Sequence, residues 1–397
     1  MGPGAGAMSA DAATAADAAR AADAARAAGP VRVVGAARAA GPARAAGSGP
    51  SAVDRATKRT RVLAVLDAAQ AEAVVLRSHT AVSWYLDGAR THVGLAGDPV
   101  VWVVVDRTGD LVVTTANERD RLAAEELPPE LPVAALPWHE PLATAVPPGA
   151  VDESMLAGPL RQARASLLPA EAARFAGLGR DCAEVLTDTL TTTRPDETER
   201  ALAARVAAAL AARGTDPLTV LVGGASRAAH RHPLPTDAPL GGRAMVVVCG
   251  RRAGLIANLT RWVRFTPPTA AERATAARIR AVEEAFFQAT TPGRTLADVL
   301  TEASAAYGAA GFEPDEWRRH HQGGAAGYHG RDPRAAPGGT DVVAVDQAFA
   351  WNPTAPGNKI EDTVLLTAEQ PAVLTVDPRW PVTDGPRFPR PDELVRP

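Results

Sequence analysis

The sequence is poor in several residue types, and each shortage excludes a class of protein. Two cysteines, Cys182 and Cys249, occur in 397 residues, which is too few for a disulfide framework, so a reducing, cytoplasmic location is expected. No run of about 18 apolar residues is present, and the N-terminal segment lacks the apolar core of a secretory signal, so neither a membrane span nor secretion is expected. The formal net charge of −3 provides no basic field, which argues against a nucleic-acid partner.

Residues 1–53 have almost no large apolar side chains. The segment consists mainly of Ala, Gly, Arg and Pro, and a near-repeat of six residues begins at Asp11. A segment that cannot bury an apolar core does not fold by itself, so residues 1–53 are predicted to be a disordered Ala/Arg/Gly-rich tail. Two other interpretations stay open: a start codon assigned too far upstream, or an arm for targeting or interaction.

Residues 54–150 alternate between helical and strand patterns, which predicts an N-terminal α/β domain. Helical spacing covers residues 60–70 and 119–126, and the strand-like stretches are 73–76, 82–88, 100–106 and 111–117. Residues 151–172 contain Pro159 and Pro169 without a strand pattern and are interpreted as a linker.

A second domain is predicted over residues 173–370. Its expected order is two helices, a strand, a hairpin that turns at Ala253 and Gly254, two more helices and two strands; the ranges are 169–191, 196–213, 219–223, 244–250, 255–265, 269–290, 291–311, 342–353 and 360–367. Residues 371–397, rich in Pro, Arg and Asp, are predicted to be a tail that wraps the surface or is loose.

Five short motifs occur in this order in the chain: PDETE (195–199), HPLPTD (232–237), LTR (259–261), TPGRTLADV (291–299) and NPTAPGNKIEDTVLLT (352–367). Together they resemble the motifs of the creatinase/prolidase/aminopeptidase P family, over roughly residues 54–370. The resemblance implies a creatinase-like α/β domain followed by a C-terminal pita-bread domain, and a homodimer.

The same resemblance implies that most metal ligands are missing. Peptidases of this family bind two metal ions through an Asp on each hairpin strand, a His in a Gly-His-Gly segment, and a Glu on each of the last two strands. The matching positions here are Val247 or Val248, Asn258, Gly324, Asn352 and Glu361. No Asp or Glu occurs between Asp237 and Glu272 in any alignment. Two divalent cations need several carboxylates, so no dinuclear centre, no other metal and no cofactor is expected.

Creatinase, in the same family, works without metal, which suggests what chemistry remains. The resemblance places His232 as general acid/base and Glu361 as a group that orients it or binds a cation. Six further residues are predicted to bind substrate: Arg331, Asp332, Arg261 and Trp351 near the cavity, and Arg90 and His92 on a loop that reaches the partner subunit in creatinase-like dimers. Structural roles remain open for several of them: an N-capping or loop histidine for His232, a remnant acid held by Lys359 or Arg261 for Glu361, a core position for Trp351, and an ordinary solvated loop for Arg90 and His92.

Two other groups are assigned no chemistry. His320, His321 and His329 are interpreted as surface or hydrogen-bonding histidines, because no carboxylates accompany them. Cys249 lies on a strand that is expected to be buried, where a thiol is a poor nucleophile.

Three functions follow, in order of preference. The first is metal-independent hydrolysis or elimination at a C–N bond of a small amino-acid-like substrate or short peptide. The second is a non-catalytic pseudopeptidase that acts as a dimeric binding module. The third is a metal-dependent Xaa-Pro aminopeptidase or dipeptidase whose ligands lie at other positions.

Overall fold

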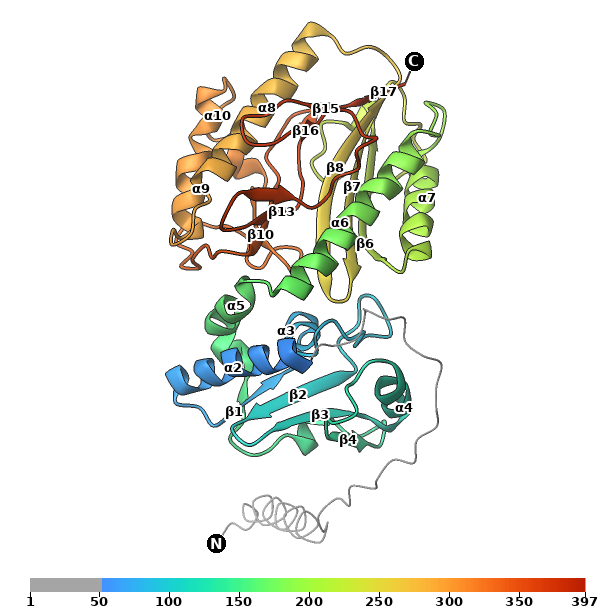
Figure 1. The fold of residues 1–397 in the computed structure, drawn as a ribbon. Helices are drawn as coiled ribbons and strands as arrows, with labels where there is room; N and C mark the ends of the chain where they lie inside the picture. Colours follow the sequence, from blue (N-terminus) through green and yellow to red (C-terminus); the bar gives the residue numbers. More distant parts are fainter. Residues whose placement is uncertain (1–51, 397) are drawn as a thin grey trace, which may run out of the picture. The chain divides into compact units, whose positions relative to one another are not determined.

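The structure is a computed structural model that describes residues 52–396, all within one compact unit. The predicted tail over residues 1–53 therefore lies outside the described residues, apart from its last two. Those two already belong to the first described helix, α2 (Ala52–Ala69). Figure 1 shows the arrangement of the described helices and strands.

The N-terminal part is built on a five-stranded sheet with the order β4-β3-β2-β1-β5. Its strands are β1 (Ala73–Leu76), β2 (Val101–Asp106), β3 (Asp110–Thr115), β4 (Val133–Leu136) and β5 (Val151–Asp152). β1, β2 and β3 pair antiparallel, while β4 and β5 join the two edges in parallel. With helices α2, α3 (His79–Tyr85) and α4 (Ala116–Glu125), this confirms the predicted α/β domain.

One predicted strand of this part is a helix. Residues 82–88 overlap α3, which begins after Ser78, whose hydroxyl accepts a hydrogen bond from the Ala81 backbone N–H. Trp84 and Tyr85 are both buried, so the apolar run has no period-2 alternation to identify a strand. A short apolar run without alternation fits either structure, and here the N-cap decides for the helix.

The segment predicted to be a linker is largely regular. Residues 151–172 hold β5, a 3₁₀ turn (Glu153–Leu156), α5 (Ala157–Ala165) and the start of α6 (Pro169–Leu190). Leu160 of α5 is buried in the same apolar core as Val62 of α2. Pro169 stands at the first position of α6, where a proline loses no helical hydrogen bond, so it starts this helix rather than interrupting one.

The C-terminal part contains two four-stranded sheets. The first has the order β17-β8-β7-β6, with β6 (Asp216–Gly224), β7 (Arg243–Arg252), β8 (Leu255–Arg264) and β17 (Leu394–Val395). The second has the order β14-β13-β10-β9, with β9 (Gly323–Ala326), β10 (Gln347–Trp351), β13 (Val364–Leu366) and β14 (Pro371–Val373). A small hairpin of β11 (Thr354–Ala355) and β12 (Asn358–Lys359) stands between β10 and β13.

Helices pack on the outer side of each sheet, two on the first and three on the second. Helices α6 and α7 (Glu199–Ala212) flank β6, β7 and β8, while α8 (Ala270–Ala289), α9 (Leu296–Ser304) and α10 (Ala306–Ala309) lie beside β10 and β13 (Figure 1). Two separate apolar clusters mirror this division, one containing Phe175 and Val248 and the other Phe286 and Phe349. The predicted helices and the hairpin turn at Ala253 and Gly254 (φ 49° and 75°) are confirmed.

The predicted C-terminal tail is part of both sheets. It contributes β14 to one sheet and β17 to the other, and its own β15 (Val382–Thr383) pairs with β16 (Arg390–Pro391). Arg390 is buried and forms ion pairs with Glu283 of α8 and with Asp362. These buried ion pairs hold residues 371–396 against the domain, whereas their composition alone suggested a tail that wraps the surface or is loose.

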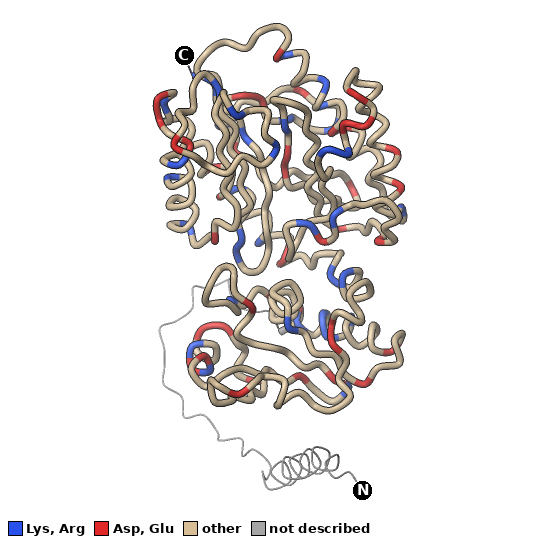
Figure 2. The backbone as a smooth tube through the Cα atoms, turned by 180° about the vertical axis from the view of Figure 1, so that it is seen from behind, with Lys and Arg blue, Asp and Glu red and all other residues tan. Residues whose placement is uncertain are grey.

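Charged residues are interspersed along both parts of the described chain (Figure 2). Within residues 52–396, no helix is long and apolar enough to cross a membrane.

Candidate functional site

A cavity of about 410 Å³ opens within the C-terminal part, between its two sheets. It brings together three of the predicted site residues, His232, Glu361 and Arg331. The other lining residues come from β6, β7, β8 and the loops of the second sheet: Thr219, Leu221, Val247, Cys249, Asn258, His321, His329, Gly330, Arg334, Asn352 and Lys359.

Glu361 is the one acidic residue among those that line this cavity, and it is fully engaged. The Arg331 guanidinium bonds to its Oε1, the Lys359 ammonium lies 3.3 Å from its Oε2, and the Thr260 hydroxyl donates to Oε2 at 2.8 Å. Burial disfavours the charged form, but Lys359, Arg331 and the Thr260 hydrogen bond together lower the pKa of Glu361 to about 2. The carboxylate is therefore ionised at neutral pH and already neutralised by two cations.

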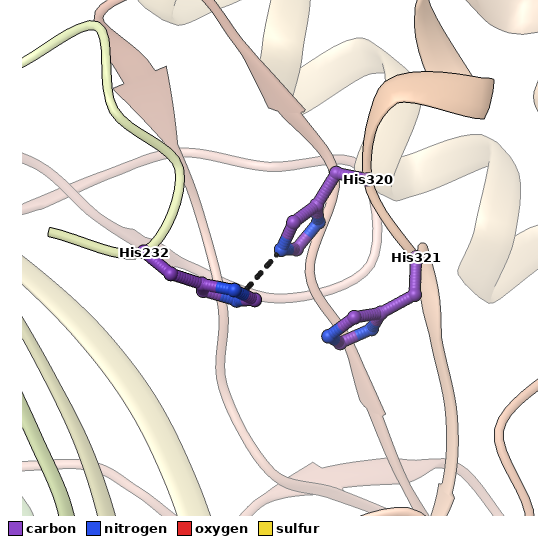
Figure 3. Close-up of side chains that lie close together, drawn as sticks. All are labelled: His232, His320 and His321. Carbon is purple, nitrogen blue, oxygen red and sulfur yellow. Dashed lines mark hydrogen bonds between the residues drawn. The ribbon is translucent and has the colours of Figure 1, made fainter.

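Three histidines converge at one end of the cavity (Figure 3). His232 follows β6 on the HPLPTD loop, while His320 and His321 directly precede β9. The Nε2 atoms of His232 and His320 are 3.0 Å apart, and the rings of His320 and His321 stack with centroids 4.3 Å apart. Of the two roles expected for His320, surface or hydrogen-bonding, the structure shows the hydrogen-bonding one, with His232 as its partner, and His321 lies beside both rings.

All three imidazoles are neutral at physiological pH. Burial and the Lys359 charge lower the pKa of His320 to about 2. Burial together with Arg331 and Arg334 lowers the pKa of His321 to about 3. Burial and Lys359 also lower the pKa of His232, although Glu361 opposes this. Each ring thus keeps one nitrogen lone pair that can accept a proton or bind a cation.

Two asparagines and a cysteine complete the polar lining. The Oδ1 atoms of Asn258 and Asn352 are buried and, among the described residues, make no hydrogen bond. Burial, with a smaller contribution from the Glu361 charge, raises the pKa of the Cys249 thiol, so this side chain is protonated. The lining therefore offers neutral amide oxygens and a protonated thiol beside one neutralised carboxylate.

Three predicted substrate-binding residues do not line this cavity. Arg261 is buried and pairs with Asp362 at 2.8 Å. Asp332 accepts two hydrogen bonds from Arg164, at 2.5 and 2.7 Å, and faces a neighbouring cavity. Trp351 is a core residue that stacks on Phe286. Each of these side chains already has a structural partner.

Arg90 and His92 also lie outside the cavity. Arg90 forms ion pairs with Glu125 and Glu126 of the N-terminal part. His92 Nε2 is 3.3 Å from Asp216 Oδ2, and burial together with the Arg251 charge lowers the His92 pKa. Their predicted role in the cavity of a partner subunit stays a prediction.

Sequence reasoning missed Arg334. Its side chain is exposed and lines the cavity, and among residues 52–396 no acidic side chain forms an ion pair with it. Arg331 and Lys359, by contrast, are held by Glu361. The position of Arg334 three residues after Arg331 was the one available signal in the sequence, because a loop that carries one cation into the cavity can carry a second.

Two sheets enclosed between helix pairs, preceded by a smaller α/β domain, define a pita-bread protein. The solved structures with this fold include the dipeptidase PepE from Mycobacterium ulcerans, with 18% identity and a TM-score of 0.67 over 86% of this chain and 98% of that one. The prolidase from Pyrococcus horikoshii OT3 matches with 17% identity and a TM-score of 0.66, over 81% and 99% of the two chains.

A third solved structure with this fold is the N-terminal domain of FACT complex subunit SPT16 from chickpea. It matches with 12% identity and a TM-score of 0.61, over 81% of this chain and 97% of that one. Residues 177–368 match the model of metallopeptidase family M24. The predicted relationship to the creatinase/prolidase/aminopeptidase P group and the predicted fold class are confirmed. No curated protein sequence gives a significant match.

Proposed function

We propose that the cavity binds a small anionic, amino-acid-like molecule and cleaves a C–N bond in it, by hydrolysis or elimination, without a dinuclear metal centre. The observation that carries this proposal is the state of Glu361. Its two oxygens are bound by Arg331, Lys359 and Thr260, so the one carboxylate of the lining is not available to a metal.

The residues of the cavity do not fit the two metal ions that the family match implies. Asn258 and Asn352 provide neutral amides, and Val247 provides no ligand. Gly324 could not carry a ligand without a backbone shift, since a Cβ atom there would lie 2.5 Å from the Pro333 carbonyl oxygen. Two divalent cations would meet the charges of Lys359 and Arg331 with one shared carboxylate to offset them, which is electrostatically unfavourable.

An anionic ligand fits the same charges. Arg331, Arg334 and Lys359 oppose the single carboxylate of Glu361, so the lining carries a net positive charge. Arg334 has a free guanidinium fork, which can bind a ligand carboxylate through two parallel hydrogen bonds. The cavity volume of about 410 Å³ suits a small molecule or a dipeptide.

His232 is the proposed catalytic residue. Its neutral ring accepts a proton from water in hydrolysis, or from the carbon next to the scissile bond in elimination. The same proton then passes to the departing nitrogen, so the ring ends the cycle neutral. The bond between the Nε2 atoms of His232 and His320 fixes the ring orientation and allows the two rings to share the proton.

A non-catalytic binding protein is the second candidate, and one observation favours it. The ion pairs of Glu361 remove the lone carboxylate of the lining as an acid or base. Proton transfer then depends on histidines whose pKa values are lowered, and which are weak bases.

The deciding experiment screens the full-length protein, in the presence of EDTA, against amino acids, N-methylated and guanidino compounds and Xaa-Pro dipeptides. Thermal stabilisation identifies ligands, and release of ammonia or amine reports turnover. Arg334→Ala should weaken binding about tenfold or more, because a charge-assisted hydrogen bond is lost. His232→Asn should preserve binding and lower turnover by about 100-fold or more.

Arg318→Ala is the matched control, because Arg318 is an exposed arginine of the same domain, paired with Asp315 and absent from the cavity lining. Binding without turnover in the wild type would support the second candidate. Turnover that requires added Mn²⁺ or Co²⁺ would contradict the proposal.

A further inference from the structure

The three-histidine cluster has a property that the proposed reaction does not use. One ring nitrogen from each of His232, His320 and His321 lies within 4.8 Å of the other two. In Figure 3 the rings of His320 and His321 both point toward His232. The proposed proton transfer needs one such nitrogen, so it does not account for the convergence of three neutral imidazoles.

We infer that His232, His320 and His321 form a site for a single borderline transition-metal ion such as Zn²⁺, separate from the two-metal positions of the family. Three imidazoles with an open fourth position are an established donor set for Zn²⁺. None of the three side chains stands at a position that corresponds to a family metal ligand, which are Val247 or Val248, Asn258, Gly324, Asn352 and Glu361.

The distances suit this ion. With Zn–N bonds of about 2.0–2.1 Å, two ligand nitrogens of a tetrahedral site lie about 3.3 Å apart. The Nε2 atoms of His232 and His320 already lie 3.0 Å apart. The His321 ring has to move closer to the other two, because the three ligand nitrogens lie up to 4.8 Å apart. The Nδ1 atoms of His321 and His320 make no hydrogen bond within the described chain. No hydrogen bond at Nδ1 therefore opposes rotation of the His321 ring.

The chemistry of the donors selects among metals. The cluster contains imidazole and no carboxylate, so it favours Zn²⁺, Ni²⁺, Cu²⁺ or Co²⁺ over Mg²⁺, Ca²⁺ or Mn²⁺, which prefer oxygen ligands. Lys359, Arg331 and Arg334 repel any cation, while Glu361 partly offsets them. Since residues 52–396 contain one such cluster of three ligand atoms, the expected stoichiometry is one ion per chain.

Occupation of the site has a functional consequence. A metal ion bound to His232 uses the lone pair that would accept the substrate proton, so Zn²⁺ would inhibit the proposed reaction. The binding inference itself does not rest on that reaction, because binding is measured without substrate.

The test uses the untagged full-length protein, freed of metal with EDTA and then dialysed into plain buffer. Isothermal titration with ZnCl₂ should give one equivalent bound, and Co²⁺ should produce the visible absorption bands of a four-coordinate site. His320→Ala and His321→Ala should each weaken Zn²⁺ binding about tenfold or more, because one of three ligands is removed.

His329→Ala is the matched control, because His329 lines the same cavity but is not one of the clustered histidines. It should change Zn²⁺ affinity by less than about twofold, since no ligand is lost. Zn²⁺ should raise the melting temperature of the wild type and of His329→Ala, but not that of His321→Ala, and melting curves in EDTA show whether each variant is folded.

Two results would overturn the inference: no Zn²⁺ binding by the folded wild type, or Zn²⁺ binding that survives both cluster substitutions. Binding of two Mn²⁺ ions per chain would instead contradict the proposed function. Absence of turnover in EDTA with intact one-site Zn²⁺ binding would count against the proposed reaction alone.

Discussion

At the scale of single residues, Glu361 determines the charge of the cavity. Its carboxylate is buried against two cations that have no other acidic partner in the described chain, because Arg331 and Lys359 each form one ion pair, with Glu361. Lys359 is buried as well. A carboxylate held in this way has a structural role. In our proposal Glu361 therefore positions Arg331, in place of the catalytic role that the sequence suggested.

We expect Glu361→Gln to lower the free energy of unfolding by about 3 kcal/mol at pH 7, since it leaves two cations without their counter-charge. Urea denaturation measures the effect. Glu369→Gln, an isosteric change at an exposed residue of the same segment, is the control and should cost less than about 0.5 kcal/mol. Equal costs for the two variants would show that solvent screens the ion pairs of Glu361.

The pH dependence of this contribution has a defined sign. The folded-state pKa of Glu361 is about 2, below the ordinary value of 4.5, so the folded protein binds fewer protons than the unfolded chain between these values. The stabilisation is complete above about pH 5 and disappears as the pH falls toward 2. The stability difference between the wild type and Glu361→Gln should therefore shrink over that range in urea titrations.

Residue-level prediction from sequence succeeded where a motif fixes position in the chain and failed where position depends on the fold. His232 and Glu361 belong to motifs, and they lie in one cavity as predicted. His320 and Arg334 belong to no motif, so their proximity to His232 depends on how the loop before β9 and the loop after it return to the first sheet. Arg261 was expected at the site because the resemblance aligns it with the family's strand arginine, and Trp351 because it stands next to Asn352, but both side chains are buried away from the cavity.

At the scale of elements, β9 leaves no room for a side chain at Gly324, the position that the sequence resemblance aligns with a ligand histidine. Gly324 has φ +145°, a region that only glycine adopts readily. Its Cβ position lies 2.5 Å from the Pro333 carbonyl oxygen and 2.6 Å from the Ala335 nitrogen. An isolated antiparallel β-bridge joins Gly324 to Arg334, and the backbone of residues 333–335 fills the space that a side chain at Gly324 would need.

Gly324→Ala should therefore destabilise the protein by about 3 kcal/mol, the sum of backbone strain and overpacking. Gly327→Ala is a matched control one residue beyond β9, where a Cβ atom would meet nothing within 4 Å and φ is not in the positive region. It should be neutral or stabilise by about 0.5 kcal/mol. Thermal or urea unfolding of the two variants compares them, and similar effects would mean that β9 can move away from the Pro333 segment.

The helices of the C-terminal domain were predictable because long amphipathic patterns with acidic or Thr caps identify them, as in α8, where Thr269 and Glu272 form a capping box. α3 and α5 were missed because each is short, with 7 and 9 residues. The C-terminal strands were missed for another reason, because the contacts that hold them are distant in sequence. Arg390 donates a hydrogen bond to Glu283, 107 residues away, and the Trp380 indole donates one to the Asp392 carbonyl, 12 residues away, and no local pattern encodes such contacts.

At the scale of the whole molecule, a buried charge cluster joins the N-terminal and C-terminal parts. Lys58 of α2 lies 2.6 Å from Asp87 Oδ1 and 2.8 Å from Glu171 Oε1 at the start of α6. Glu171 also accepts a hydrogen bond from the Tyr328 hydroxyl at 2.6 Å, two residues after β9. One lysine thus connects the first helix, the first residues of α6 and, through them, the loop that leads into the cavity.

Lys58→Met should cost about 3 kcal/mol, because it removes the buried cation that pairs with both Asp87 and Glu171. Arg77→Met, which breaks an exposed ion pair with Asp152, should cost less than about 0.5 kcal/mol. Since the cluster ties both parts together, hydrogen exchange should accelerate equally in peptides from residues 101–115 and from 243–264 of the Lys58 variant. Faster exchange in the N-terminal peptides alone would mean that the two parts unfold independently and that the junction contributes only local order.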